Sequence, residues 1–141
     1  MSMSIVITTY NRSEVLKKNL DCFKQQTDKD FEVVVAIDGS TDDTKQMLES
    51  YESFFPLRWV DTLETDKYCL AKARNMGIVE TTRPIIAIID DDSFPVPEFV
   101  QAHKSSVKQG VLTGGYRNSH DPSDSLHPKM RSTLMKYGVC K

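Results

Sequence analysis

The sequence has few cysteines, no long hydrophobic run and no excess of positive charge. Cys22, Cys69 and Cys140 are odd in number and widely spaced, without the spacing of a metal site. We therefore expect reduced thiols and a cytoplasmic protein. The apolar runs are far shorter than the roughly 20 residues of a membrane-spanning helix, so no transmembrane segment is expected. A net charge of −2 argues against a partner held by basic charge, such as a nucleic acid.

What the sequence does contain is an ordinary globular composition, with 39% hydrophobic and 27% charged residues over 141 positions. That length suffices for one domain with a hydrophobic core, and the composition excludes disorder. Strand-like and helix-like patterns alternate along the chain. We expect strands at residues 4–9, 31–37, 57–60 and 84–89, and a last one at 111–116. We expect helices at residues 13–26 with Ser13 as the cap, after the turn at 38–43, at 70–79, and from Pro97 to Gly110.

Buried strands that alternate with helices predict an α/β fold with a mainly parallel sheet and right-handed crossovers. In such a sheet, ligands bind beyond the carboxyl ends of the strands. Three polar clusters follow the ends of predicted strands, at residues 8–12, 38–40 and 90–92. They should therefore converge on one edge of the sheet.

The most charged of these clusters is Asp90-Asp91-Asp92, which ends the most apolar stretch of the chain. Two like charges about 4 Å apart repel by roughly 1 kcal/mol in water and by roughly 4 kcal/mol near a protein surface. Such a run is typical of a site for a hard divalent cation, because Mg²⁺ and Mn²⁺ take carboxylate and phosphate oxygens. A solvated acidic loop is the alternative interpretation.

Four motifs carry a resemblance to a known family. In chain order they are Ile-Val-Ile-Thr-Thr-Tyr-Asn-Arg, Ile-Asp-Gly-Ser-Thr-Asp-Asp-Thr, Ala-Arg-Asn-Met-Gly-Ile, and Ile-Ile-Asp-Asp-Asp-Ser followed by Pro97. Their order and spacing resemble family-2 glycosyltransferases of the GT-A fold, from residue 4 to about residue 115. The resemblance implies a three-layer α/β/α sandwich and a single domain over residues 1–141. Residues 1–116 would be its nucleotide-sugar-binding half, and residues 117–141 an irregular tail that could be a remnant of the acceptor half.

The resemblance implies an inverting transfer from a nucleotide-diphospho-sugar, first of all a UDP-sugar, with Mn²⁺ or Mg²⁺ as cofactor. It places Thr8, Tyr10 and Asp38 around the nucleobase, with Asp38 accepting a hydrogen bond from a ring N–H. Arg12, Lys72 and Arg74 are the basic candidates near the base or the diphosphate.

For the acidic run, the resemblance makes Asp92 the metal ligand. Asp90 or Asp91 would face the ribose or support the metal indirectly, and Asp90 is the second metal candidate. The donor-nucleotide site is thus assigned to Thr8, Tyr10, Arg12, Asp38, Lys72, Arg74, Asp90 and Asp91.

The acceptor side is where the sequence departs from the family. Relatives continue well past this length and supply there an acceptor cleft and a carboxylate base. The later carboxylates of this chain, Asp121 and Asp124, do not resemble that base motif, so the catalytic base is not identified. The acceptor would be a saccharide or a lipid-linked molecule. A homo-oligomer or a missing C-terminal half could complete the cleft.

Two other functions stay open. A nucleotide-binding module without turnover would need only the donor half. A signalling domain of the response-regulator kind also holds Mg²⁺ with acids at strand ends, but it uses a late lysine at a strand end. No lysine stands in that role after Val111.

Overall fold

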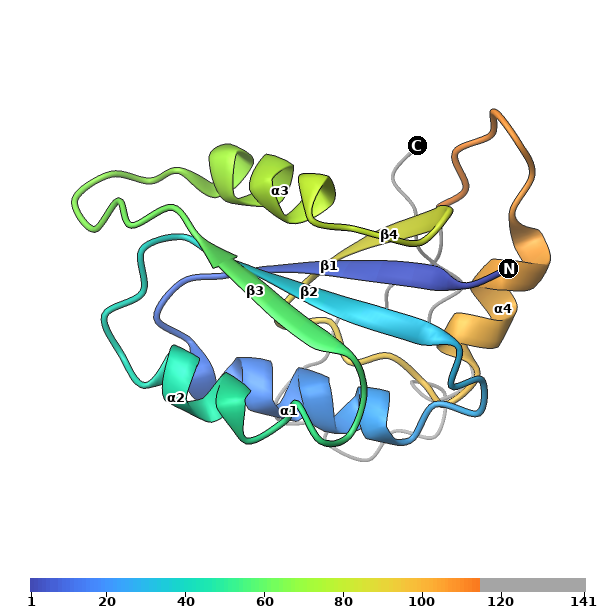
Figure 1. Ribbon diagram of the computed structural model, residues 1–141, viewed down its shortest axis with the longest axis horizontal. Coiled ribbons are helices and arrows are strands. Elements are labelled where there is room, and N and C mark those ends of the chain that lie inside the picture. Colours follow the sequence, from blue (N-terminus) through green and yellow to red (C-terminus); the bar gives the residue numbers. More distant parts are fainter. Residues whose placement is uncertain (115–141) are drawn as a thin grey trace, which may run out of the picture.

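The structure, a computed structural model, describes residues 1–114. In this part of the chain a four-stranded sheet carries helices on both faces (Figure 1). All three strand pairings are parallel, and the sheet order is β3-β2-β1-β4, which confirms the predicted α/β class. The strands are β1 (Met3–Thr9), β2 (Phe31–Ile37), β3 (Leu57–Asp61) and β4 (Ile85–Asp90). The helices are α1 (Ser13–Lys24), α2 (Thr44–Glu49), α3 (Leu70–Val79) and α4 (Phe99–Ser106).

The two central strands are buried along their whole length, which explains their continuous apolar and β-branched sequences. Helices α1 and α2 lie against one face of the sheet and α3 against the other (Figure 1). The result is the three-layer arrangement that the sequence predicts.

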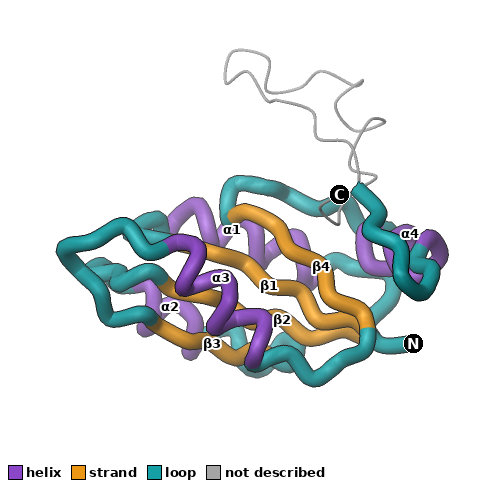
Figure 2. Tube along the Cα trace, turned by 90° about the horizontal axis from the view of Figure 1, so that it is seen from above, coloured by secondary structure: helices purple, strands orange, loops and turns teal. Residues whose placement is uncertain are grey.

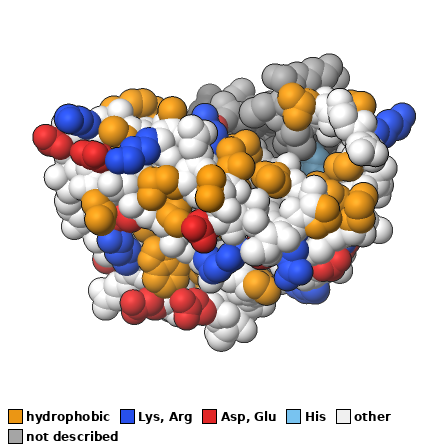
Figure 3. Space-filling model, turned by 45° about the horizontal axis from the view of Figure 1, so that its top comes forward, with side chains coloured by type: hydrophobic (Ala, Val, Ile, Leu, Met, Phe, Trp, Pro, Cys, Tyr) orange, Lys and Arg blue, Asp and Glu red, His pale blue; other side chains and the backbone are white. Residues whose placement is uncertain are grey.

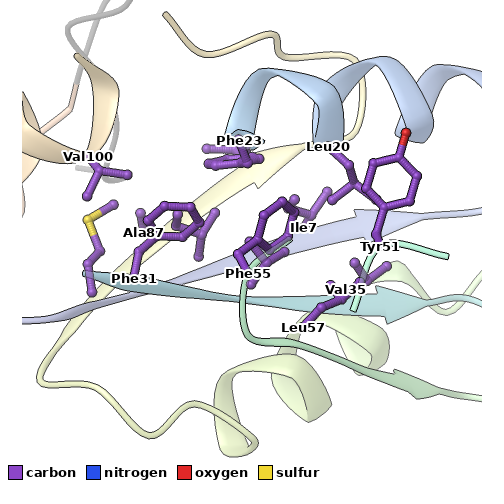
Figure 4. Close-up of a cluster of buried hydrophobic side chains, with 14 of the residues drawn as sticks. Ile7, Leu20, Phe23, Phe31, Val35, Tyr51, Phe55, Leu57, Ala87 and Val100 are labelled. Atoms are coloured by element: carbon purple, nitrogen blue, oxygen red, sulfur yellow. The ribbon is translucent and has the colours of Figure 1, made fainter. Parts of the chain in front are cut away.

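The larger core lies between the sheet and the layer of α1 and α2, where α4 also contributes Phe99 and Val100 (Figure 4). Phe23 of α1 is at its centre, with ring centroids 5.8 Å from Phe31 and 6.1 Å from Phe99. Burying one such ring stabilises the fold by roughly 1.5–3 kcal/mol. These contacts hold α1 and α4 against the sheet.

Helix α3 packs much closer to the sheet, through Ala73 and Gly77. A Cβ atom on Gly77 would lie 2.8 Å from Val6 Cγ1 and 3.0 Å from Ala36 Cβ. Seen from above, α3 crosses the sheet over β1, β2 and β3 (Figure 2). The small side chains of α3 therefore set the height of this helix over the sheet.

The pleat of the strands divides their side chains between the two layers. Ile5, Ile7 and Val35 belong to the core under α1, whereas Val6 and Ala36 face α3. By the same alternation, the polar residues at the strand ends fall on opposite faces. Thr8, Asp38 and Asp90 lie on the α3 face, and Thr9 and Asp91 lie on the α1 face.

Strand β4 lies at one border of this sheet, where it pairs only with β1 among residues 1–114. Its α3-facing residues, Ile86 and Ile88, are only partly buried. No helix in this part of the chain is long and apolar enough to cross a bilayer.

Three local expectations differ from the structure. Residues 111–114 of the last predicted strand are irregular, and Val111 and Leu112 are exposed, while residues 115–116 lie outside the described part. Helix α4 begins at Phe99 and ends at Ser106, inside the predicted range from Pro97 to Gly110, because the backbone is already extended at Val107, with φ −67° and ψ 133°. Ser13 does not cap α1, since its hydroxyl donates to Asp43 Oδ1 instead.

Candidate functional site

The three polar clusters predicted from the sequence meet at the carboxyl edge of the sheet. Thr8 and Asp90 are paired residues of β1 and β4. The backbone N–H of Asp38 donates to the carbonyl of Thr9 at 2.9 Å, so the end of β2 is adjacent. Three side chains of this edge, those of Thr8, Asp38 and Asp90, therefore share the face that α3 covers.

Asp38 is the most firmly held of these groups, with 2% of its surface exposed. Its Oδ1 accepts a hydrogen bond from Thr62 Oγ1 at 3.1 Å, and its Oδ2 accepts one from the backbone N–H of Cys69 at 2.9 Å. Cys69 directly precedes α3. Asp38 is thus tied to the end of β3 and to the start of α3, and it does not cap α2.

Asp91 turns to the opposite face and is 3% exposed. Thr9 Oγ1 donates to its Oδ2 at 2.8 Å, and Arg12 Nη1 lies 3.1 Å from its Oδ1. Burial raises the pKa of Asp91 above its ordinary value, against the opposing effects of the Thr9 hydrogen bond and the Arg12 charge. The structure separates this carboxylate from Thr8 and Asp38.

Arg12 also reaches Asp92, whose Oδ2 lies 3.4 Å from Arg12 Nη2. The Asp92 side chain is 47% exposed, and Asp90 is exposed as well. In residues 1–114 no group of three His, Cys, Asp or Glu side chains is arranged to hold a metal ion by itself. Two exposed carboxylates nevertheless fit a hard cation, because Mg²⁺-type sites use one or two carboxylates together with phosphate oxygens and water.

The remaining predicted residues lie around this edge. Tyr10 follows β1 and is 45% exposed. Lys72 is exposed on α3, and its Nζ lies 3.1 Å from Glu64 Oε1. Arg74 is half-buried, and its Nε makes no hydrogen bond with any described residue. Arg74 is thus a cation on α3 whose Nε–H can donate one further hydrogen bond.

Sequence reasoning did not assign a role to Asn11, which joins two of the clusters. Its Oδ1 accepts from the backbone N–H groups of Thr41 at 2.7 Å and Asp42 at 3.3 Å, and its own N–H donates to Ser40 Oγ at 2.9 Å. The φ of Asn11 is 45°, in the left-handed region that asparagine tolerates better than most residues. The position of Asn11, between the end of a strand and the start of a helix, was the feature of the sequence that could have indicated this role.

The sequence analysis also assigned no role to the residues at the end of β3. Asp61 Oδ1 accepts from the N–H groups of Gly39 at 3.0 Å and Leu63 at 2.9 Å, and Asp61 Oδ2 lies 2.7 Å from Lys45 Nζ. Gly39 has a φ of 68°, and a Cβ atom there would lie 2.1 Å from the Glu64 carbonyl oxygen. Only glycine fits this corner, which packs the turn after β3 against the turn after β2.

The face that carries α3 shows hydrophobic side chains scattered among charged ones (Figure 3). Beside α3 a shallow groove of about 550 Å³ is lined by Val60, Lys72, Asn75, Met76, Val79 and Glu80. It lies on the β3 side of the helix and does not include the strand-end acids.

Comparison with known proteins identifies the family. The family model for glycosyl transferase family 2 matches residues 4–137. The chain belongs to glycosyl transferase family 2. This membership confirms the resemblance that the four motifs carry, and the GT-A fold is confirmed by solved structures.

Among sequence relatives, this family 2 chain is 35% identical to validoxylamine A glucosyltransferase of Streptomyces hygroscopicus subsp. jinggangensis over 144 residues, 96% of this chain and 33% of that protein. It is 36% identical to chondroitin synthase of Escherichia coli over 124 residues, 86% of this chain and 18% of that protein. The chain spans a third or less of these two relatives.

Two solved structures match this chain well. Staphylococcus aureus TarS 1–349 in complex with UDP-GlcNAc has a TM-score of 0.68 at 28% identity and covers 74% of this chain and 30% of that one. The mannosyltransferase PcManGT from Pyrobaculum calidifontis, in complex with GDP-Man and Mn²⁺, has a TM-score of 0.70 at 25% identity. That match covers 82% of this chain and 35% of the other.

Proposed function

We propose that this chain forms the donor-binding part of a glycosyltransferase that transfers a sugar from a nucleotide-diphospho-sugar to an acceptor hydroxyl with inversion. The observation that carries the proposal is the meeting of Thr8, Asp38 and Asp90 on one face of the carboxyl edge, beneath the start of α3. The nucleotide-sugar complex of TarS and the GDP-Man complex of PcManGT support this substrate class.

In this proposal the nucleobase lies against Asp38, Thr8 and Tyr10. A carboxylate offers about four acceptor positions, and two of those on Asp38 are already used by Thr62 and Cys69. Those that are left accept a ring N–H, which uracil and guanine present. Both bases fit this contact, and the UDP-GlcNAc complex of TarS supports a UDP-sugar as the first candidate donor.

The diphosphate lies toward the acidic run and α3. Arg74 has an Nε without a partner among residues 1–114, which suits a phosphate oxygen, and Lys72 adds a second cation on the same helix. Asp92, with Asp90, holds Mn²⁺ or Mg²⁺, and PcManGT in complex with Mn²⁺ supports the choice of ion. When bound, such an ion neutralises the charge that develops on the leaving diphosphate.

The acceptor half of the reaction has no residues assigned. A general base must come within about 2.6–3.2 Å of the acceptor hydroxyl. The two late carboxylates, Asp121 and Asp124, lie outside the described residues. The acceptor, a saccharide or lipid-linked molecule, and any homo-oligomer stay predictions.

A nucleotide-binding module without transfer is the second candidate, because the residues assigned above among residues 1–114 serve donor binding and none of them is assigned as a general base. An assay of sugar release and transfer with Mn²⁺ separates the two functions. Binding of UDP without either reaction favours the module.

Calorimetric titration of UDP, with Mn²⁺ and with the ion removed by a chelator, tests the donor site. We expect Mn²⁺-dependent binding in the wild-type chain and its loss in Asp92→Ala, because the substitution removes an exposed metal ligand. The fold should persist, since the Asp92 side chain is 47% exposed. The far-ultraviolet circular dichroism of Asp92→Ala checks this point. Unchanged Mn²⁺-dependent affinity in Asp92→Ala contradicts the assignment.

A further inference from the structure

Thr62 lies beside Asp38 at the carboxyl edge of the sheet. The β2–β3 pairing ends with Ile37 opposite Asp61, and the next N–H, that of Thr62, donates to the Ile37 carbonyl at 3.0 Å. Val60, two residues earlier, packs in the cluster on the α3 face. Thr62 therefore points to the same face as Asp38, and it is 8% exposed.

The direction of the Thr62 hydroxyl proton follows from its neighbours. The backbone N–H of Glu64 donates to Thr62 Oγ1 at 3.3 Å, which uses the hydroxyl as an acceptor. The hydroxyl donates its own proton in a second hydrogen bond, and the acceptor is Asp38 Oδ1 at 3.1 Å. The bond is charge-assisted and buried, which makes it stronger than a neutral hydrogen bond.

The rest of the corner restrains Thr62 in turn. Asp61 holds the N–H groups of Gly39 and Leu63 with one oxygen, and the Glu64 carbonyl lies where a side chain of residue 39 would be. Leu63 has a φ of 60°, so the turn after Thr62 is tight. A threonine held by such a turn can fix the rotation of a neighbouring carboxylate.

We infer that Thr62 is a positioning residue for nucleotide recognition: its hydroxyl fixes the Asp38 carboxylate so that the unused lone pairs face the base. The inference rests on the proposed function, because it assigns Asp38 to the nucleobase. Two donors from different elements, the Thr62 hydroxyl of the β3 end and the Cys69 N–H before α3, hold the carboxylate at both oxygens. Without Thr62 one oxygen is released, and the carboxylate turns about the bond to Cys69.

The test compares Thr62→Val, which removes the hydroxyl at nearly constant shape, with Thr62→Ser, which keeps it. We expect Thr62→Val to lower UDP affinity about tenfold in the presence of Mn²⁺, and pyrophosphate affinity to stay within about twofold. Thr62→Ser should restore UDP binding. Thr81→Val is the matched control, because the Thr81 hydroxyl donates to the Ile78 carbonyl, away from Asp38.

A purely structural role of Thr62 predicts another result. Loss of stability alone would lower UDP and pyrophosphate affinity together, and equal losses would overturn the inference. So would UDP affinity in Thr62→Val equal to that of the wild type.

A spectroscopic readout keeps the inference separate from the proposed function. The carbon-13 chemical shift of the Asp38 carboxyl group should change in Thr62→Val, and it should be unchanged in Thr81→Val. An unchanged Asp38 signal in Thr62→Val overturns the inference even without nucleotide. If the Asp38 signal changes in Thr62→Val but the wild-type chain binds no UDP, the result would contradict the proposed function and leave Thr62 as the residue that orients Asp38.

Discussion

Asp90, Asp91 and Asp92 are identical and adjacent, yet each has a different environment. The pleat sends Asp90 to the α3 face and Asp91 to the α1 face, where Thr9 and Arg12 take both of its oxygens. Asp92 lies past the strand and is 47% exposed. Within the acidic run, Asp91 is therefore a buried partner of Arg12. Asp90 and Asp92 are the exposed candidates for binding the donor and its metal.

The strongest single-residue prediction concerns Asp38. Removing a carboxylate that accepts from a buried ring N–H costs about 1.5–3 kcal/mol, so Asp38→Ala should weaken UDP binding by at least about tenfold. Affinity for pyrophosphate should stay nearly constant, because in the proposed site the diphosphate does not contact Asp38. Calorimetry with both ligands measures the difference.

The control for Asp38→Ala is Asp66→Ala, which removes the same charge from an exposed position before α3. We expect it to leave both affinities near their wild-type values. Equal losses for UDP and pyrophosphate in Asp38→Ala would place this residue away from the base.

The sequence predicts which acidic residues belong to the candidate site better than it predicts the residues that bond to them. Asp38 and the acidic run are visible because charges directly after apolar strands are unusual. The bond from Thr62 to Asp38, the contact of Arg12 with Asp91 and the bond of Asn11 with Asp42 join residues that are 24 to 79 positions apart in the sequence. No local pattern encodes such contacts.

Helix α3 is the element that closes the candidate site, and its position depends on Gly77. An alanine there improves helix propensity by about 1 kcal/mol, but its Cβ would lie 2.8 Å from Val6 Cγ1. Overpacking of this kind costs about 1–3 kcal/mol. The steric cost is the larger, since the neighbour is buried beneath the helix.

We expect Gly77→Ala to lower the free energy of unfolding by roughly 1 kcal/mol. It should also weaken UDP binding, because lifting α3 moves the Cys69 N–H away from Asp38. Denaturant titration and calorimetry measure the two effects. Asn75→Ala, an exposed change on the same helix, should alter stability by less than about 0.5 kcal/mol. A Gly77→Ala chain as stable as the wild type would contradict the close packing.

The elements themselves follow closely from the sequence where burial is complete. Strands β1, β2 and β4 have near-continuous apolar sequences and begin and end close to the predicted residues. Residues 111–114 have a similar pattern but are irregular in the structure. A short apolar run becomes a strand only when a neighbouring strand pairs with it, and the sequence alone does not provide that information.

The carboxyl and amino edges of the sheet differ in the polar groups that they carry. The carboxyl edge carries the candidate site, and the amino edge carries a buried charge, Glu32, whose side chain is 6% exposed. Glu32 accepts from Ser4 Oγ at 2.6 Å and from the N–H and hydroxyl of Thr82, both at 2.8 Å. Arg58 Nη2 lies 3.2 Å away.

Burial alone would raise the pKa of Glu32, but the hydrogen bonds from Ser4 and Thr82 outweigh it and lower the pKa below its ordinary value. The folded state therefore binds the proton more weakly than the unfolded state does. The stabilisation is fully present above the unfolded pKa of about 4.3 and is lost as pH falls through the lower, folded value.

We expect Glu32→Gln to lower the free energy of unfolding by about 1–3 kcal/mol at neutral pH. Its stability should fall less steeply than that of the wild type between neutral pH and about pH 3. Urea titrations over this range provide the comparison, with exposed Glu52→Gln as the control. Parallel pH profiles for wild type and Glu32→Gln would show that this carboxylate does not contribute to acid sensitivity.

The border strand β4 has a consequence for handling the protein. Its sequence from Ile85 to Ile89 is apolar, β-prone and uncharged, and among residues 1–114 its outer edge has no strand partner. Open edges of this composition recruit strands from other molecules and seed aggregates. Wherever this edge stays unpaired, concentrated samples should tend toward intermolecular β-assembly, with β4 as the point of nucleation.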